Sequence, residues 1–454
     1  MLSWHSDISM YAAVTAGTAA FMLAGVFVGI AGYASVFVSQ NHGAGNSSKI
    51  GSVVWQSLLL SLVSGLVIAC LGRLLAPMFA WFGHESALAA LEAEYFRLLT
   101  GGSVFSLAAT SLSCFWTGRK KTWTVLAVNL LGVGAAVLFN LLFIFGWDGV
   151  DPGGMLPGFT IAGWPPLGIS GAGMSAVLAD LLKTVVLLCM FLSPGNRRRY
   201  ATLPGLVPDV SLMRKMLGVG FGNGCQLLLS VSTMAFFYLL IGLYAAKNGA
   251  AEVAVASGIA FSLNSAVFVP LAGLGSAAAV LVAHGIGAGR VDHVLKIVSK
   301  VRYLAFLYMA LASLPFTLLS GRAIAIFARN GIVAAPVAEL ATIYLYCALA
   351  VFIGDGCSML YGSAIRGAGD TRYAAKISVV SGAFLLALSL AAFRLGAGPE
   401  TLWGLIAFYA AARAAAYYHR YRQGQWLRLC LADRNGFPDG QALIATGGLQ
   451  TGPA

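Results

Sequence analysis

The chain has 454 residues, of which 59% are hydrophobic and only 10% are Asp, Glu, Lys or Arg. A soluble protein carries about 25% charged residues, so this chain cannot cover itself with a solvated surface. The composition excludes a soluble multidomain protein, a disordered chain and a disulfide-dense secreted module. The 55 glycines in an apolar background are typical of closely packed transmembrane helices. The net charge of +12 is better explained by cytoplasmic loops than by nucleic-acid binding.

Runs of about 20 apolar residues predict eleven transmembrane helices, and the strict alternation of barrel strands is missing. In chain order the helices are expected at 10–39, 50–80, 93–117, 122–146, 168–193, 214–245, 251–284, 294–320, 335–364, 371–395 and 401–419. The predicted fold class is therefore an all-α polytopic membrane protein.

Basic residues gather in the loops that follow odd-numbered helices. These loops carry Lys49, Arg119, Lys120, Lys121, Arg197, Arg198, Arg199, Arg214, Lys215, Arg290, Lys296, Arg366, Arg372, Arg420, Arg422 and Arg428. The other loops offer only Lys247, Arg322 and Arg329, and the loop 147–167 has Asp148 and Asp151 without a base. The positive-inside rule predicts that the first set and the C-terminus are cytoplasmic. A bacterial inner (cell) membrane is the expected location.

The sequence repeats itself. VSQNHGAGN (38–46) recurs as VAHGIGAGR (282–290), which pairs Gly43 with Gly287, and WTGRKKTW (116–123) recurs as IRGAGDTR (365–372), which pairs Gly118 with Gly367. Two motifs in the same order and at nearly one offset indicate two homologous halves in parallel orientation. The predicted organisation is an N-terminal bundle of five helices (1–195), a cytoplasmic linker (196–213), a C-terminal bundle of six helices (214–424) and a cytoplasmic tail (425–454), disordered after Leu431.

The helix at 214–245 has its counterpart in the first half before residue 1. We therefore expect either that the first bundle has lost its opening helix or that the start codon has been assigned too far downstream. Restoring one helix would also return the N-terminus to the cytoplasm, where eleven helices leave it outside.

Several loop and helix motifs carry a family resemblance. They are SQNHGAG (39–45), FNLLFIFG (139–146), LGISGAG (167–173), IAFSLNSAVFVPLAGLG (259–275), HGIGAG (284–289), SAIRGAGDTR (363–372) and RYRQGQW (420–426). From residue 2 to 428 the chain resembles the multidrug and toxic compound extrusion (MATE) family, and in particular its bacterial multidrug-efflux branch. The resemblance implies two six-helix bundles that rock about a substrate site between them. It also implies export of bulky, often cationic organic compounds, driven by inward flow of Na⁺ or H⁺.

Carboxylates inside a bilayer are costly, so each deep one is a functional hypothesis. Only Asp180 and Asp355 lie well inside apolar helices. Asp355 precedes Arg366 by eleven residues, a spacing that matches an acidic cation- or substrate-binding position of the family's second bundle. The alternative is a structural Asp that caps a break between Gly354 and Gly356.

Asp180 lies three residues before Lys183, which places both on one helix face. A static ion pair and a proton- or cation-responsive group are equally compatible with this spacing. Asn140, on the preceding helix, is a candidate amide ligand for the same chamber or else a plain interhelical hydrogen-bond partner. Na⁺ binding is thus a hypothesis for Asp355 or Asp180, and no cofactor is expected.

Two acids that are usual in the family are absent. The first-bundle acid belongs to the missing helix, and a second-bundle Glu aligns with Ser230, for which Gln226 one turn earlier is a candidate substitute. Coupling through either bundle is thereby in question. Arg413, in the last helix, either extends to the cytoplasmic surface or meets a carboxylate.

The leading hypothesis is a monomeric, cation-coupled drug exporter with small organic substrates, membrane lipid around it and no nucleic-acid partner. One alternative is a flippase for lipid-linked precursors, which a strongly basic central cavity would favour, and another is a non-functional truncated transporter. An enzyme is not expected, because the six His residues lie near loops or helix ends.

Overall fold

The computed structural model describes residues 6–81, 85–146, 166–318 and 335–428. Several residues named above lie outside these ranges, namely Asp148, Asp151, Arg322, Arg329 and the tail beyond residue 428.

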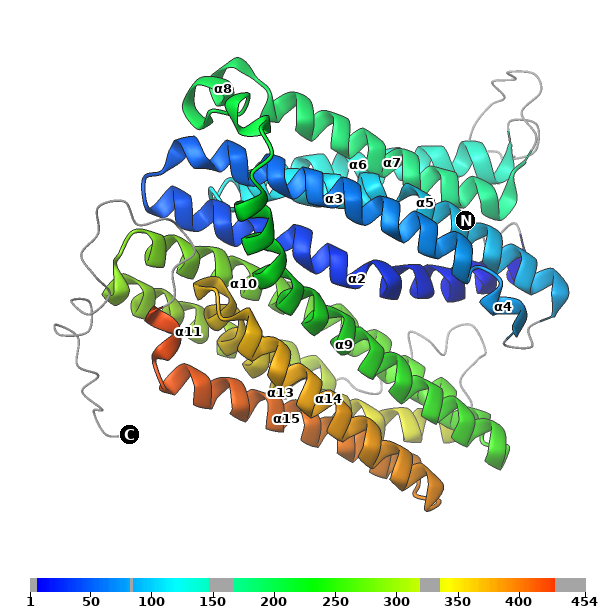
Figure 1. Cartoon of the computed structure of the whole chain (residues 1–454). Coiled ribbons are helices and arrows are strands. Elements are labelled where there is room, and N and C mark those ends of the chain that lie inside the picture. The colour runs from blue at the N-terminus through cyan, green and yellow to red at the C-terminus, as the bar shows by residue number, and fades with distance from the viewer. Residues whose placement is uncertain (1–5, 82–84, 147–165, 319–334, 429–454) are drawn as a thin grey trace. The chain divides into compact units, whose positions relative to one another are not determined.

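Long helices make up nearly all of the described chain (Figure 1). In the first half they are α2 (Asp7–Gly43), α3 (Ser47–Leu75), α5 (Ser86–Thr117), α6 (Thr122–Phe145) and α7 (Gly168–Phe191), with the short α4 (Met78–Trp81) and α8 (Pro194–Tyr200). In the second half they are α9 (Val210–Asn248), α10 (Ala251–Gly287), α11 (Val291–Leu318), α13 (Ala335–Ala368), α14 (Thr371–Arg394) and α15 (Pro399–Arg422). Short 3₁₀ turns, η1 (Pro204–Leu206) and η2 (Gln425–Arg428), follow α8 and α15. These long helices confirm the predicted all-α class, one for each apolar run.

The lengths of the helices reproduce the internal repeat. Helices α2, α3, α5, α6 and α7 have 37, 29, 32, 24 and 24 residues. Their counterparts α10, α11, α13, α14 and α15 have 37, 28, 34, 24 and 24 residues. The two halves are therefore pseudo-symmetric, and α9 precedes the repeated set in the second half.

Ten helices of the described chain are long and apolar enough to cross a membrane. The long helix that fails this test is α15, whose sequence includes Arg413 and a polar end, YYHRYR. At about 1.5 Å per residue, its 24 residues still have the length of a span. For α15 to lie in a bilayer, the charge of Arg413 in its middle must therefore be compensated.

The chain divides into two compact units, residues 1–42 with 46–224 and residues 43–45 with 225–454. The division falls within α9, beyond the predicted linker 196–213. That linker is ordered against the first unit, and Gln56 of α3 holds it. The Gln56 amide nitrogen donates to the carbonyl of Val207 (2.9 Å), and its oxygen accepts from the backbone of Asp209 (3.1 Å).

Paired glycines permit close helix contacts at equivalent places in the two units. A Cβ on Gly118, at the end of α5, would lie 2.7 Å from the carbonyl oxygen of Ser35 in α2. A Cβ on Gly367, at the end of α13, would lie 2.4 Å from the carbonyl oxygen of Ala279 in α10. Because no side chain fits at such distances, small residues let the backbones meet, as is common between membrane helices.

The loops after these helices share a left-handed residue. Gly45 after α2 and Gly289 after α10 have φ of 77° and 69°. After α13 the residue is Gly369, at φ 115°, whereas its counterpart after α5 is Lys120, at φ 63°. The repeat thus keeps its backbone conformation even where the glycine that favours it is replaced.

Each unit packs around one central helix. In the first unit α5 packs against α3 and α7, and in the second α13 packs against α10 and α15. The core of the second unit includes Trp403 of α15, stacked on Tyr344 of α13 with 5.6 Å between ring centroids. The central helix α13 is also the one that carries Asp355.

Candidate functional site

The second unit holds a buried ion pair between α13 and α15. Arg413 Nη2 donates to Asp355 Oδ1 at 2.6 Å, and the two side chains are 11% and 16% exposed. The helices approach closely beside the pair, because a Cβ on Gly354 would lie 2.8 Å from the Cβ of Ala410. The pairing resolves the two alternatives for Arg413: it meets a carboxylate.

Tyr409 supports the arginine from one turn earlier on α15. Arg413 Nη1 donates to the Tyr409 hydroxyl at 3.1 Å, and the guanidinium carbon lies 5.1 Å from the centre of the ring. Within the described residues, Arg413 Nε has no hydrogen-bond partner. Arg413 therefore binds Asp355 through Nη2 of its guanidinium and Tyr409 through Nη1.

The pair explains how α15 tolerates a charge in its middle. An isolated buried arginine would be costly, and so would an isolated buried aspartate, but together they have no net charge. Removing one partner of a buried pair typically costs about 3–5 kcal/mol, because the other is left unpaired. Asp355 is thus the partner of a basic side chain rather than a cap on a helix break, since α13 is continuous from Ala335 to Ala368.

The first unit holds the ion pair that the spacing of Asp180 and Lys183 predicts. Lys183 Nζ lies 2.5 Å from Asp180 Oδ1, and each side chain is about a quarter exposed. The stem of Lys183 crosses to α6, where a Cβ on Gly132 would lie 2.5 Å from Lys183 Cδ. Next to it, the Thr184 hydroxyl donates to the carbonyl of Phe105 in α5 at 2.8 Å. The pair therefore lies where α7 packs on its two neighbours.

The remaining predicted residues are placed separately. Asn140 is half-buried near the end of α6, and no hydrogen bond joins it to Asp180 in the described part of the chain. Gln226 is half-buried on α9, and its amide oxygen has no hydrogen-bond partner among the described residues. Asp355 and Asp180 thus have basic partners, while the roles of Asn140 and Gln226 remain predictions.

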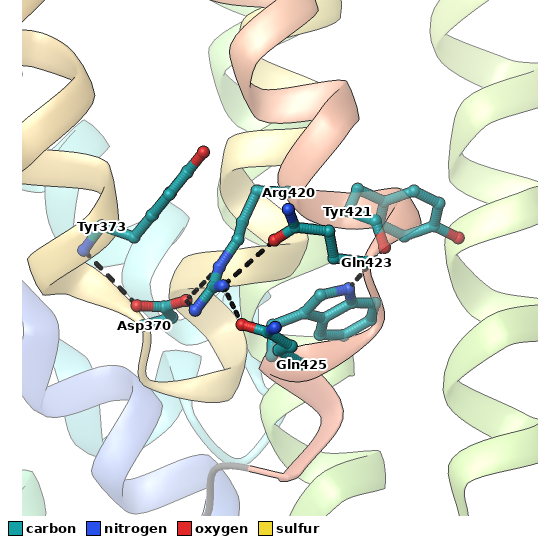
Figure 2. Close-up of polar contacts among 7 residues, drawn as sticks. Asp370, Tyr373, Arg420, Tyr421, Gln423 and Gln425 are labelled. Carbon is teal, nitrogen blue, oxygen red and sulfur yellow. Dashed lines mark hydrogen bonds and ion pairs between the residues drawn. The ribbon is translucent and has the colours of Figure 1, made fainter.

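A second polar cluster joins two of the sequence motifs at one end of the second unit (Figure 2). Arg420 donates to Asp370 Oδ2 from both Nε (2.9 Å) and Nη2 (2.8 Å). Its Nη1 donates to the side-chain oxygens of Gln423 (3.2 Å) and Gln425. The cluster ties the GAGDTR turn before α14 to the RYRQGQW segment that ends α15.

Asp370 also begins α14, because its Oδ1 accepts from the backbone of Tyr373 at 3.4 Å (Figure 2). Beside it, Trp426 is fully buried, stacks on Tyr421 and donates to the Tyr421 carbonyl at 3.0 Å. These bonds all hold helix ends together, so we assign the cluster to the packing of the helix ends.

Asp355 and Asp180 are evident in the sequence because carboxylates are rare in apolar runs, whereas Tyr409 and Ser358 are not predicted. Ser358 lies three residues after Asp355, is 3% exposed, and its hydroxyl has no hydrogen-bond partner in the described ranges. Helical spacing from Asp355 and Arg413 is the one signal in the sequence that points to both residues.

Comparison with known proteins places the chain in a family. The model of the MatE family matches residues 1–142 and 227–393. The chain is 24% identical over 338 residues to a probable multidrug resistance protein NorM of Pasteurella multocida, which covers 74% of this chain and 68% of that protein. It is 28% identical over 382 residues to a probable multidrug resistance protein NorM of Deinococcus radiodurans, and this alignment covers 82% of this chain and 77% of that protein.

A solved structure has the same fold. It is described as an outward-facing conformation of a multidrug resistance MATE family transporter, and it aligns with a TM-score of 0.79 at 16% identity over 93% of this chain and 89% of that one. The family match includes Asp355 but ends before Arg413 and omits Asp180.

Proposed function

The chain belongs to the MatE family of membrane transporters, and from that premise we propose that it exports organic, often cationic, drugs or toxic compounds by antiport with Na⁺ or H⁺. The observation that carries the proposal is the buried Asp355, a carboxylate inside a membrane-spanning helix and within the family match. Intramembrane carboxylates of transporters are the groups that bind and release cations.

The coupling role that we propose for Asp355 follows from its pairing. A carboxylate between two helices favours one packing when a cation neutralises it and another when it does not. Because Asp355 joins α13 to α15, exchange of its cationic partner changes the contact between these two helices. Asp180, joined to Lys183 on α7, is our candidate for a corresponding group in the first unit. Gln226 and Asn140 are proposed to contribute amide groups to substrate or cation binding.

The experiment that tests the function uses efflux of ethidium from drug-sensitive bacterial cells that express the chain. We expect the wild type to lower ethidium accumulation and D355N to abolish this effect at equal protein abundance, because the amide cannot carry the charge that exchanges. D209N is a matched acid-to-amide control, since Asp209 is exposed and precedes α9, outside the spans. Gradient-dependent efflux by D355N would reject the role of Asp355.

We also propose that the chain lies as a monomer in the bacterial inner membrane with its C-terminus in the cytoplasm. The support is the distribution of bases, which in the described chain includes Arg119, Lys120 and Lys121 after α5, Arg197, Arg198 and Arg199 on α8, and Arg420 and Arg422 at the end of α15.

Fusions with a fluorescent protein that folds only in the cytoplasm test this orientation. A fusion after Arg428 is expected to fluoresce, and one after Phe145, on the opposite side, is expected to remain dark. The reverse pattern would contradict the orientation, and alkaline phosphatase fusions at the same two sites supply the complementary signal.

A further inference from the structure

One face of α13 packs against α15 on both sides of the Asp355–Arg413 ion pair. Gly354 and Gly362 both pack on α15, since a Cβ on Gly354 would lie 2.8 Å from Ala410 and a Cβ on Gly362 would lie 3.4 Å from the ring of Tyr417. Residues four apart on a helix share a face, so Ser358, midway between the two glycines, also faces α15. Arg413 lies between Ala410 and Tyr417 on the partner helix. Ser358 and Arg413 are therefore at the same level of one helix–helix contact.

Ser358 brings an unsatisfied hydroxyl to this contact. It is 3% exposed and has no hydrogen-bond partner within the described residues. Ser381 of α14, in contrast, satisfies its hydroxyl by donating to the carbonyl of Ile377 in the preceding turn at 2.6 Å. A buried hydroxyl without a partner is rare and costly, so it gains free energy from any ion that it can help to bind.

Asp355 and Ser358 are neighbours on the helix surface. Side chains three residues apart on a helix lie about 5–6 Å from each other at their Cβ atoms. Together they offer carboxylate and hydroxyl oxygens, the ligands that small hard cations prefer. Arg413 already holds one of these oxygens, at 2.6 Å.

We propose that Asp355 and Ser358 form a latent oxygen site for a small cation, and that Arg413 occupies it as a tethered cation that keeps Na⁺ away from Asp355. This inference deepens the proposed function, on which it rests, by naming what regulates cation binding at Asp355. The guanidinium takes the place that a free coupling cation would otherwise fill.

The cost of displacing Arg413 decides the competition. A Na⁺ ion that takes Asp355 leaves the guanidinium buried with one neutral partner, Tyr409, and with an Nε that has no acceptor in the described chain. Uncompensated buried charges are costly enough to lower the affinity of Na⁺ by about a hundred-fold or more. Removal of Arg413 reverses the balance, because Asp355 then becomes the unpaired charge and gains from any cation that reaches it.

The test measures Na⁺ binding to the purified full-length protein through its thermal stability at about pH 8. Na⁺ replaces choline at constant ionic strength, so that only a specific site responds. We expect no Na⁺-specific change in Tm for the wild type, and a rise of about 3 °C or more at about 100 mM Na⁺ for R413Q. D355N/R413Q is expected to lose the response, and S358A/R413Q to need several-fold more Na⁺.

The controls separate the site from a general effect of charge. R413K keeps a tethered cation and is expected to stay insensitive to Na⁺. K183Q removes the corresponding base of the first unit and leaves Arg413 in place, so it is not expected to create a response that D355N removes.

Two results overturn the proposal. One is a Na⁺ response in the wild type that D355N removes, a measurement that remains decisive if R413Q does not fold. The other is a folded R413Q protein without any Na⁺ response. These outcomes are separable from the proposed function: absence of drug efflux under every ion gradient rejects export, whereas the Tm measurement still decides which cation occupies Asp355.

Discussion

At the scale of single residues, each of the two carboxylates inside the apolar helices, Asp355 and Asp180, forms an ion pair with a basic side chain. Asp355 and Arg413 join α13 to α15, and Asp180 and Lys183 lie on the single helix α7. Since α7 and α15 are equivalent helices of the two units, each unit has a base near the middle of its last helix with a carboxylate beside it. Of these two pairs, only the one in the second unit links two helices, so we expect cation exchange at Asp355 to have the larger mechanical consequence.

Lys120 provides a prediction about the backbone. It adopts φ 63°, a conformation in which its counterpart in the repeat is Gly369. The left-handed conformation costs a non-glycine residue roughly 1–2 kcal/mol. Glycine avoids this strain, but its greater freedom in the unfolded chain offsets about 0.5–1 kcal/mol of the gain. K120G is therefore expected to stabilise the protein by about 0.5–1 kcal/mol, seen as a higher Tm in detergent.

K120A is the control for the lost charge, because alanine keeps the Cβ and its strain. We expect K120A to have the Tm of the wild type. Equal gains from K120A and K120G would mean that charge, and not backbone strain, limits stability at this turn.

The acids of the site could be predicted from the sequence better than their partners. Asp355 and Asp180 stand out because charge is rare in apolar runs, and Lys183 follows from helical spacing. The partner of Asp355 is 58 residues away, on a helix whose rotation is set by packing at Gly354 and Ala410. Ser358 and Tyr409 carry no signal of their own, because Ser and Tyr are common in these helices.

Close contacts between helices depend on glycines at the positions where two backbones meet. Gly118 and Gly101 both belong to the α5 region, but only Gly118 has a neighbouring helix within reach of a Cβ. G118A is expected to destabilise the first unit by about 1–3 kcal/mol, because the new methyl group would overlap Ser35 and Val38 of α2. A lower Tm in detergent is the expected measurement.

G101A is the matched control. Nothing lies within 4 Å of a Cβ at this position, so alanine should raise helix stability by about 0.5–1 kcal/mol. If both alanine variants changed Tm in the same direction, close approach of α2 and α5 would not be the reason for the glycine.

The positions of the long helices were predictable because each is an apolar run, but the order of the linker was not. Residues 194–213 contain three prolines and a run of arginines, which resemble a loose connection. The linker is fixed instead by Gln56 and by Trp55, whose indole donates to the carbonyl of Thr202 at 2.5 Å. Side chains of a distant helix supply these bonds, so local composition could not reveal them.

For the molecule as a whole, the repeat is the strongest link between sequence and structure. Short motifs pair Gly118 with Gly367, and the structure extends that pairing to the helix lengths and to the carbonyls that the two glycines meet. The two units nevertheless differ in charge arrangement. We therefore expect the second unit, with Asp355 and Arg413, to carry the coupling that defines the transporter.

Transport by the purified protein in proteoliposomes decides whether Asp355 couples ions to drug movement. Ethidium movement is recorded while a H⁺ or a Na⁺ gradient is imposed, for the wild type and for D355N. We predict ethidium movement against its gradient in the wild type under at least one ion gradient, and none in D355N reconstituted at equal density. Equal transport by the two proteins, or none by the wild type under either gradient, would contradict a coupling role for Asp355.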